Sequence, residues 1–210
     1  MRRVTEADPR GPGTEREELE RRLALATPTD TVRGMFFRSV LGVVRALGDE
    51  GAVERCVEEC GERKFVDFSC YPMSTFLRLL GTAARLLGDG YGDFAGALRA
   101  LGRRGATDFF ASSIGRPLRT LLMGNPKRLL DSLPKAYALV STNGGRCSVT
   151  WGASRNALIL LDRDFFPCPY VEGALVAAFE VVGVRTPRVR GRLTGPLASE
   201  YALTWEGEHA

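Results

Sequence analysis

The sequence predicts an α+β fold in which a helical N-terminal half packs on an antiparallel sheet of β-β-β-α-β-β order. Up to about residue 134, apolar residues recur at offsets of three and four, which is the spacing of amphipathic helices. Beyond that point the segments become short and rich in β-branched and aromatic residues, with one helical stretch among them. A run of helices followed by a run of strands favours an α+β fold over a Rossmann-type sheet.

The domain organisation follows from the same change of pattern. Residues 1–14 mix Pro and Gly with charges and predict a disordered tail. Residues 15–210 predict a single α+β domain, with a helical half over 15–134 and a sheet half over 135–206. A chain of 210 residues is long enough for one such core.

The helices of the first half are delimited by Gly, Pro and capping residues. We expect them over residues 15–25, from a cap at Asp30 to about Leu47, and over 51–60, 71–87, 91–111, 116–123 and 126–133. The helix over 91–111 contains Gly102 and Gly105, each of which weakens a helix interior by about 1 kcal/mol relative to Ala.

The strands of the second half are expected at Tyr137–Thr142, Cys147–Trp151, Ala157–Asp162, Thr186–Leu193 and Tyr201–Trp205, with a helix at Pro169–Val182. Asn143-Gly144-Gly145 predicts a hairpin between the first two strands, because Asn-Gly tolerates positive φ.

Composition narrows the class of protein. Hydrophobic residues make up 44% and charged residues 26%, which excludes global disorder, and the net charge of +4 demands no nucleic-acid or membrane partner. No apolar run reaches the roughly 18 residues of a membrane span, and no apolar stretch follows the charged start as in a signal peptide. We therefore expect a cytoplasmic protein without membrane contact, whose five cysteines are free thiols.

No catalytic or metal-binding motif stands out. There is no Gly-x-Ser-x-Gly, Walker loop or Gly-x-Gly-x-x-Gly, and the sole histidine is His209, near the C-terminal end. Cys56 and Cys60 share a helix face but lack zinc-type spacing, so structural thiols are favoured. We expect no enzymatic activity, no metal and no cofactor. A cysteine mechanism at Cys147 or Cys168, with arginines lowering the thiol pKa, stays open.

Two basic segments offer a route to anion binding. Residues 99–128, which include Arg116, carry seven Lys and Arg against one Asp, and Arg188, Arg190 and Arg192 alternate along one predicted strand face. A solvated face balanced by acids elsewhere is the favoured interpretation, because no aromatic or groove-reading motif accompanies the arginines.

Aromatic residues gather where the two halves are expected to meet, a common place for a ligand pocket. Plain core packing is the favoured alternative. The residues are Tyr71, Tyr91, Phe109, Phe110, Tyr137, Trp151 and Tyr170.

From about Asp30 to Trp205 the chain resembles a paralogous family of unknown function that is expanded in myxobacteria. The resemblance rests on Tyr71-Pro-Met-x-x-Phe-Leu-Arg-Leu-Leu80, Tyr91-Gly-Asp-Phe-x-x-Ala-Leu-Arg-x-Leu-Gly102, Ser113-x-Gly-Arg-x-Leu118, Asn125-Pro-x-Arg-Leu-Leu130, Leu133-Pro-x-Ala-Tyr137, Tyr170-x-Glu-Gly-x-Leu175 and Ser199-Glu-Tyr-x-x-x-Trp205. The family implies no established activity.

The element order also resembles the haem nitric-oxide/oxygen-binding domains and the related vinyl-reductase-like small-molecule-binding domains. That resemblance implies a ligand between a helical half and a sheet half. Haem-binding members carry a histidine and a Tyr-x-Ser-x-Arg motif, where this chain reads Trp151-x-Ala153-x-Arg155. Only Arg155 matches, so the resemblance implies an anion anchor at Arg155 and argues against haem ligated by histidine.

These observations predict a non-catalytic regulatory or sensory module that binds a small apolar or anionic molecule, or a partner protein, in signalling. The residues expected to bind the ligand are Arg155, Trp151, Tyr137, Tyr71 and Arg116. The alternatives are a homodimeric interaction scaffold, which predicts an exposed apolar patch, and nucleic-acid or anion binding through the arginine-rich surface, with nucleic acid the less favoured.

Overall fold

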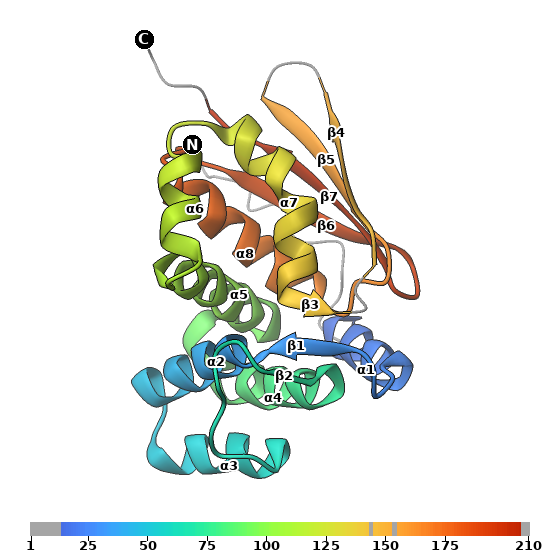
Figure 1. Ribbon diagram of the computed structural model, residues 1–210. Helices are drawn as coiled ribbons and strands as arrows, with labels where there is room; N and C mark the ends of the chain where they lie inside the picture. Colours follow the sequence, from blue (N-terminus) through green and yellow to red (C-terminus); the bar gives the residue numbers. More distant parts are fainter. Residues whose placement is uncertain (1–13, 143–144, 153–154, 207–210) are drawn as a thin grey trace, which may run out of the picture.

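The computed structural model describes residues 14–142, 145–152 and 155–206, and it confirms the α+β fold (Figure 1). Of the predicted tail, residues 1–13 lie outside the described residues and Thr14 begins the first helix. The helical half comprises α1 (Thr14–Leu25), β1 (Thr31–Arg33), α2 (Gly34–Leu47), α3 (Glu50–Cys60), β2 (Cys70–Pro72), α4 (Met73–Leu87), the 3-10 turn η1 (Gly88–Tyr91), α5 (Phe94–Ala111), α6 (Gly115–Leu122) and α7 (Pro126–Val140).

The sheet half follows the expected β-β-β-α-β-β order along the chain. It comprises β3 (Ser141–Thr142), β4 (Cys147–Trp151), β5 (Asn156–Leu161), α8 (Cys168–Val181), β6 (Arg188–Gly195) and β7 (Ala198–Thr204). Four of the strands form an antiparallel sheet in the order β4-β5-β7-β6.

The predicted hairpin between the first two strands is wrong. The short β3 pairs with β1 of the helical half, in a second sheet of order β2-β1-β3, while β4 pairs with β5. Asn143 and Gly144 lie outside the described residues. The expected strand from Tyr137 is helical as far as Val140, because α7 continues through Pro134.

Packing explains why α7 runs past its proline. A proline inside a helix removes one backbone hydrogen bond and costs about 3 kcal/mol. Beyond Pro134, Tyr137 and Val140 are partly buried side chains that pack against the hydrophobic core. Burial of these side chains offsets the cost, so tertiary contacts override the local signal that ends the predicted helix at Leu133.

Helix α8 lies between α5 and the four-stranded sheet (Figure 1), so it is buried on nearly all sides. Two glycines permit its close approach to α5. A Cβ on Gly102 would collide with the backbone carbonyl of Tyr170, and a Cβ on Gly173 would collide with that of Arg99. The glycine that weakens α5 as an isolated helix therefore serves the packing of the two helices.

An ion pair ties the two halves together. Arg163, next to the end of β5, donates from its Nη2 to both carboxylate oxygens of Asp30 at 2.8 and 2.9 Å, and the Asp30 side chain is 1% exposed. Burial opposes ionisation of Asp30, but hydrogen bonds from Thr27 and the charge of Arg163 leave its pKa below the usual value. No helix in the described ranges combines the length and apolar character needed to cross a membrane.

Candidate ligand-binding cavity

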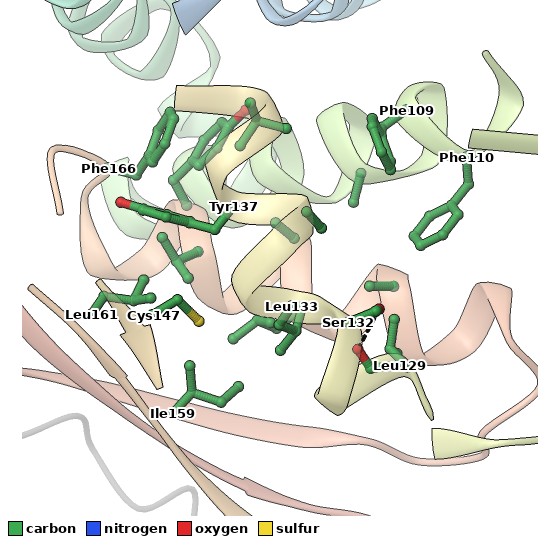
Figure 2. A pocket seen from close by; sticks show the side chains of 18 of the residues that line it. Phe109, Phe110, Leu129, Ser132, Leu133, Tyr137, Cys147, Ile159, Leu161 and Phe166 are labelled. Atoms are coloured by element: carbon green, nitrogen blue, oxygen red, sulfur yellow. Dashed lines mark hydrogen bonds between the residues drawn. The ribbon is translucent and has the colours of Figure 1, made fainter. Parts of the chain in front are cut away.

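A cavity of about 160 Å³ lies where the helical half meets the sheet. Figure 2 shows Tyr137 and Leu133 of α7 on the side of Cys147, Ile159 and Leu161 of the sheet. Leu129 lies at the other end of α7, and the α5 side chains Phe109 and Phe110 lie farther along the cavity. The cavity is therefore built by elements far apart in the sequence.

The lining is almost entirely apolar. No charged side chain belongs to it among the residues that the structure describes, and the polar groups are those of Ser132, Tyr137, Cys147 and Tyr170. The complete lining is Phe36, Ala106, Phe109, Phe110, Leu118, Leu129, Ser132, Leu133, Ala136, Tyr137, Val140, Cys147, Ile159, Leu161, Phe166, Tyr170, Val171, Ala174, Leu175 and Ala178. Such a lining suits a neutral apolar molecule.

Two of the four polar side chains donate to other groups of the protein. The Ser132 hydroxyl donates to the carbonyl of Leu129 at 2.7 Å, the dashed line in Figure 2. The Tyr137 hydroxyl donates to Asp164 Oδ1 at 3.1 Å. Burial, with the nearby charge of Asp164, raises the pKa of the Cys147 thiol to about 11, so this thiol is protonated at neutral pH.

Behind Tyr137 lies a buried polar network centred on Arg22 of α1, whose side chain is fully buried. Arg22 donates to Glu18 Oε1 at 3.0 Å, to the Ser199 hydroxyl at 2.8 Å and to the carbonyl oxygen of Asp164. Glu18 in turn accepts from the backbone N–H of Cys168 at 2.9 Å. The network fixes α1 to the start of α8 and to the sheet.

Asp164 connects this network with the cavity wall. Its carboxyl group accepts from the hydroxyls of Tyr137 and Tyr201 and from the backbone N–H of Phe166, at 2.9 to 3.1 Å. Burial raises the pKa of Asp164, while Arg22 and these hydrogen bonds oppose the rise. A movement of the Tyr137 hydroxyl is therefore passed to α1 through Asp164 and Arg22.

Of the five residues expected to bind a ligand, the structure places one, Tyr137, on the cavity wall. The aromatics Phe109, Phe110 and Tyr170, which the sequence predicts at the junction of the two halves, also line it. Tyr71 lies in β2, where its ring packs on Phe37 and Phe65 and its hydroxyl accepts from the N–H of Val66. Arg116 is exposed on α6.

Trp151 and Arg155 lie near the far end of β4 and do not line the cavity. The Trp151 ring is 38% exposed, with the Lys127 ammonium 5.3 Å from its centroid and Trp205 at its edge. Arg155 is exposed, and its carbonyl accepts from the N–H of Trp205. A role for Arg155, Trp151, Tyr71 or Arg116 in binding stays a prediction.

Acids pair with much of the basic segment 99–128. Arg99 meets Glu172 at 2.9 Å, Arg103 meets Glu180, and Arg104 meets Asp108 at 2.8 Å. On β6, Arg188, Arg190 and Arg192 are exposed, and Arg192 pairs with Glu200. These pairs lower the charge that the segments offer to an anionic partner.

The cysteines are free thiols. Burial raises the pKa of Cys168 to about 12, the opposite of what a nucleophilic thiol needs at neutral pH. Within the described ranges no three His, Cys, Asp or Glu side chains gather in a way that could hold a metal ion.

A family profile described as "Protein of unknown function (DUF2378)" matches residues 25–206. The chain belongs to the DUF2378 family. The family description states no activity, and no curated protein matches the chain. The expansion in myxobacteria and the likeness to vinyl-reductase-like domains stay predictions.

The fold of this DUF2378 chain is similar to that of H-NOX proteins. A triple mutant of an H-NOX protein from S. oneidensis in the Fe(II) ligation state has a TM-score of 0.67 at 12% identity, covering 83% of this chain and 96% of that one. The S. oneidensis H-NOX protein in the Fe(II)NO ligation state has a TM-score of 0.65 at 11% sequence identity, covering 83% of this chain and 99% of that one. The unliganded Fe(II) H-NOX protein from K. algicida has a TM-score of 0.62 at 12% sequence identity, covering 85% of this chain and 98% of that one.

The residues of the cavity do not fit haem. Histidine, the usual iron ligand, occurs only as His209, outside the described residues. The described residues of the lining offer no cation for the propionates. Its volume of about 160 Å³ is close to that of an engineered apolar cavity that binds benzene, at about 150 Å³, and below the roughly 300–1,000 Å³ of pockets for drug-sized ligands. The similarity to H-NOX proteins is therefore one of fold.

Proposed function

We propose that this chain is a non-catalytic sensory module that binds a small apolar molecule in the cavity between α5, α7, α8 and the sheet. The observation that carries the proposal is the cavity itself, with apolar walls and no charged group among its described lining residues. The H-NOX-like fold supports it, because the similar structures include an H-NOX protein in an Fe(II)NO state. The chemistry of this lining selects a different ligand from haem.

The volume of the cavity indicates the size of ligand that its walls can surround. A dry apolar cavity of about 150 Å³ accepts benzene or xenon. The value of about 160 Å³ here places the ligand in the same class, a single ring or a short branched chain. Its binding energy comes from burial of apolar surface against side chains such as Phe109, Leu133 and Leu175.

The sensory part of the proposal rests on Tyr137. This residue lines the cavity and donates to Asp164, whose carbonyl oxygen accepts from Arg22 of α1. A ligand that shifts the Tyr137 ring lengthens its hydrogen bond to Asp164 and loosens the seating of α1. The proposed output is thus a change at α1, remote from the cavity.

Titration with toluene, followed by calorimetry, tests the binding. Two alanines of α7 give a matched pair of variants. Ala136 lines the cavity, whereas Ala138 is exposed on the same helix. We expect Ala136→Phe to fill the cavity and weaken toluene binding at least about tenfold, and Ala138→Phe to leave it unchanged.

The proposal is wrong if the wild-type protein does not bind toluene, or if the two variants bind it equally well. Should Ala136→Phe unfold the protein, Ala174→Leu on α8 fills the same cavity with a smaller side chain and is expected to weaken binding in the same way.

A second candidate is binding of a protein partner or a second copy of the chain. Large apolar side chains are exposed in and around α6, where Ile114, Leu121 and Met123 are 48%, 68% and 50% exposed. Light scattering over a range of concentrations tests the homodimer. A monomer at every concentration would contradict it.

A further inference from the structure

The hydroxyl of Tyr170 has no hydrogen-bond partner among the residues that the structure describes. Tyr170 lies on α8, lines the cavity and is 4% exposed. Its oxygen is the one buried side-chain nitrogen or oxygen in the described part of the chain that no partner satisfies. A buried hydroxyl without a partner costs free energy, so a native protein that keeps one needs a reason.

The surroundings hold this hydroxyl in place. The Tyr170 ring stacks on Phe166, with centroids 5.5 Å apart, and meets the edge of Phe76 at 6.0 Å. A Cβ on Gly105 of α5 would lie 2.7 Å from the hydroxyl oxygen, so the absence of a side chain at Gly105 makes room for it.

The hydroxyl is also kept as a donor. Burial raises the pKa of Tyr170 well above its usual value, and the nearby acid Asp108 adds to the rise. The Asp108 carboxylate is paired with Arg104 at 2.8 Å. Tyr170 therefore stays protonated over the whole physiological range.

Water does not satisfy such a donor well. A buried water needs two to four polar partners. The lining offers few such partners, because its polar side chains are few and the hydroxyls of Ser132 and Tyr137, which donate to the Leu129 carbonyl and to Asp164, are left only to accept. A ligand atom that accepts one hydrogen bond and belongs to an apolar molecule matches the site better.

We propose that the ligand is a neutral molecule of about benzene size with one carbonyl oxygen, which accepts a hydrogen bond from the Tyr170 hydroxyl. This inference rests on the proposed function, because it takes the cavity as the binding site. The uncharged lining excludes a carboxylate at this position, and the apolar walls select a ring or branched chain behind the carbonyl.

The test uses two probes of the same shape, cyclohexanone and methylidenecyclohexane, in which a C=CH₂ group replaces the C=O. Calorimetric titration measures both against the wild-type protein and Tyr170→Phe. We expect Tyr170→Phe to weaken the binding of cyclohexanone about tenfold. Its affinity for methylidenecyclohexane is expected to stay within about twofold of the wild-type value. Tyr91→Phe, a change at a tyrosine 37% exposed and outside the cavity lining, is the control.

Infrared spectroscopy gives a second readout. The carbonyl stretch of bound cyclohexanone is expected at lower frequency in the wild type than in Tyr170→Phe, because a hydrogen bond weakens the C=O bond. If both probes bind and Tyr170→Phe changes neither affinity nor frequency, the carbonyl inference is overturned while the proposed cavity stands. If toluene binds the wild type and neither probe does, the carbonyl inference fails alone, and if toluene does not bind either, both proposals fail.

Discussion

The hydroxyl of Tyr137 donates to the carboxyl group of Asp164 across 3.1 Å, and this hydrogen bond joins the cavity wall to the buried network that holds α1. Asp164 keeps two further donors, the Tyr201 hydroxyl and the Phe166 N–H. The Tyr137 hydrogen bond is therefore the link that can change without dismantling the network.

Replacing Tyr137 by Phe removes this link and keeps the ring. We expect the free energy of unfolding in urea to fall by about 1–3 kcal/mol, because a buried acceptor loses a donor. Amide hydrogen exchange in α1 is expected to speed up more than in α3. Tyr91→Phe is the control and is expected to change stability by less than about 0.5 kcal/mol. Equal losses in the two variants would contradict the link.

Arg22 is the centre of the network, and its removal leaves Glu18 and Asp164 buried without their cation. We expect Arg22→Met to lower the free energy of unfolding by about 3–5 kcal/mol. Arg21→Met, one residue away on the exposed face of α1, is expected to cost less than about 0.5 kcal/mol. If thermal denaturation shows that the two variants lose the same amount of stability, Arg22 does not hold the network together.

Cys147 reports on the cavity through its reactivity. Its pKa of about 11 is raised by burial and by Asp164, so the thiolate is scarce at neutral pH. Since the thiolate is the nucleophile, the rate of alkylation by iodoacetamide is expected to rise about tenfold for each pH unit below that pKa. Toluene is expected to protect Cys147 and to leave the exposed Cys70 unprotected. Peptide mass spectrometry follows both cysteines, and equal protection of the two would count against a ligand in the cavity.

Replacement by alanine is expected to have opposite effects on stability at Gly102 and Gly42. A Cβ on Gly102 collides with the Tyr170 carbonyl, so Gly102→Ala is expected to lower stability by about 1–3 kcal/mol despite the better helix propensity of Ala. A Cβ on Gly42 of α2 meets nothing nearer than the Arg104 guanidinium at 3.9 Å. Gly42→Ala is therefore expected to raise stability by about 0.5–1 kcal/mol. Urea titration of both variants checks the signs, and a stabilised Gly102→Ala would refute the close contact of α5 and α8.

Much of the fold is predictable from sequence because long amphipathic helices such as α2 and α4 carry their own periodicity. The strands β1, β2 and β3 are not predictable in the same way, because two or three residues are too few to show a period of two. The end of α7 differs from the prediction because core packing overrides the local signal of Pro134.

The site was predictable only in its aromatic part. Phe109, Tyr137 and Tyr170 marked the junction, since large aromatics gather where two layers meet. The pair Glu18 and Arg22, four residues apart on a charge-rich helix, has the pattern of a solvated surface pair, and only the fold buries it. The Tyr170 hydroxyl likewise lacks a partner because of three-dimensional packing, and no feature of the sequence predicts it.

The cavity between α5, α7, α8 and the sheet is proposed to accept a small apolar molecule. Crystals of the protein under xenon pressure test it most directly, because xenon enters dry apolar cavities and scatters anomalously. We expect an anomalous peak bounded by Phe109, Leu133 and Leu175. A map in which side chains fill this space and no xenon is found there would contradict the account.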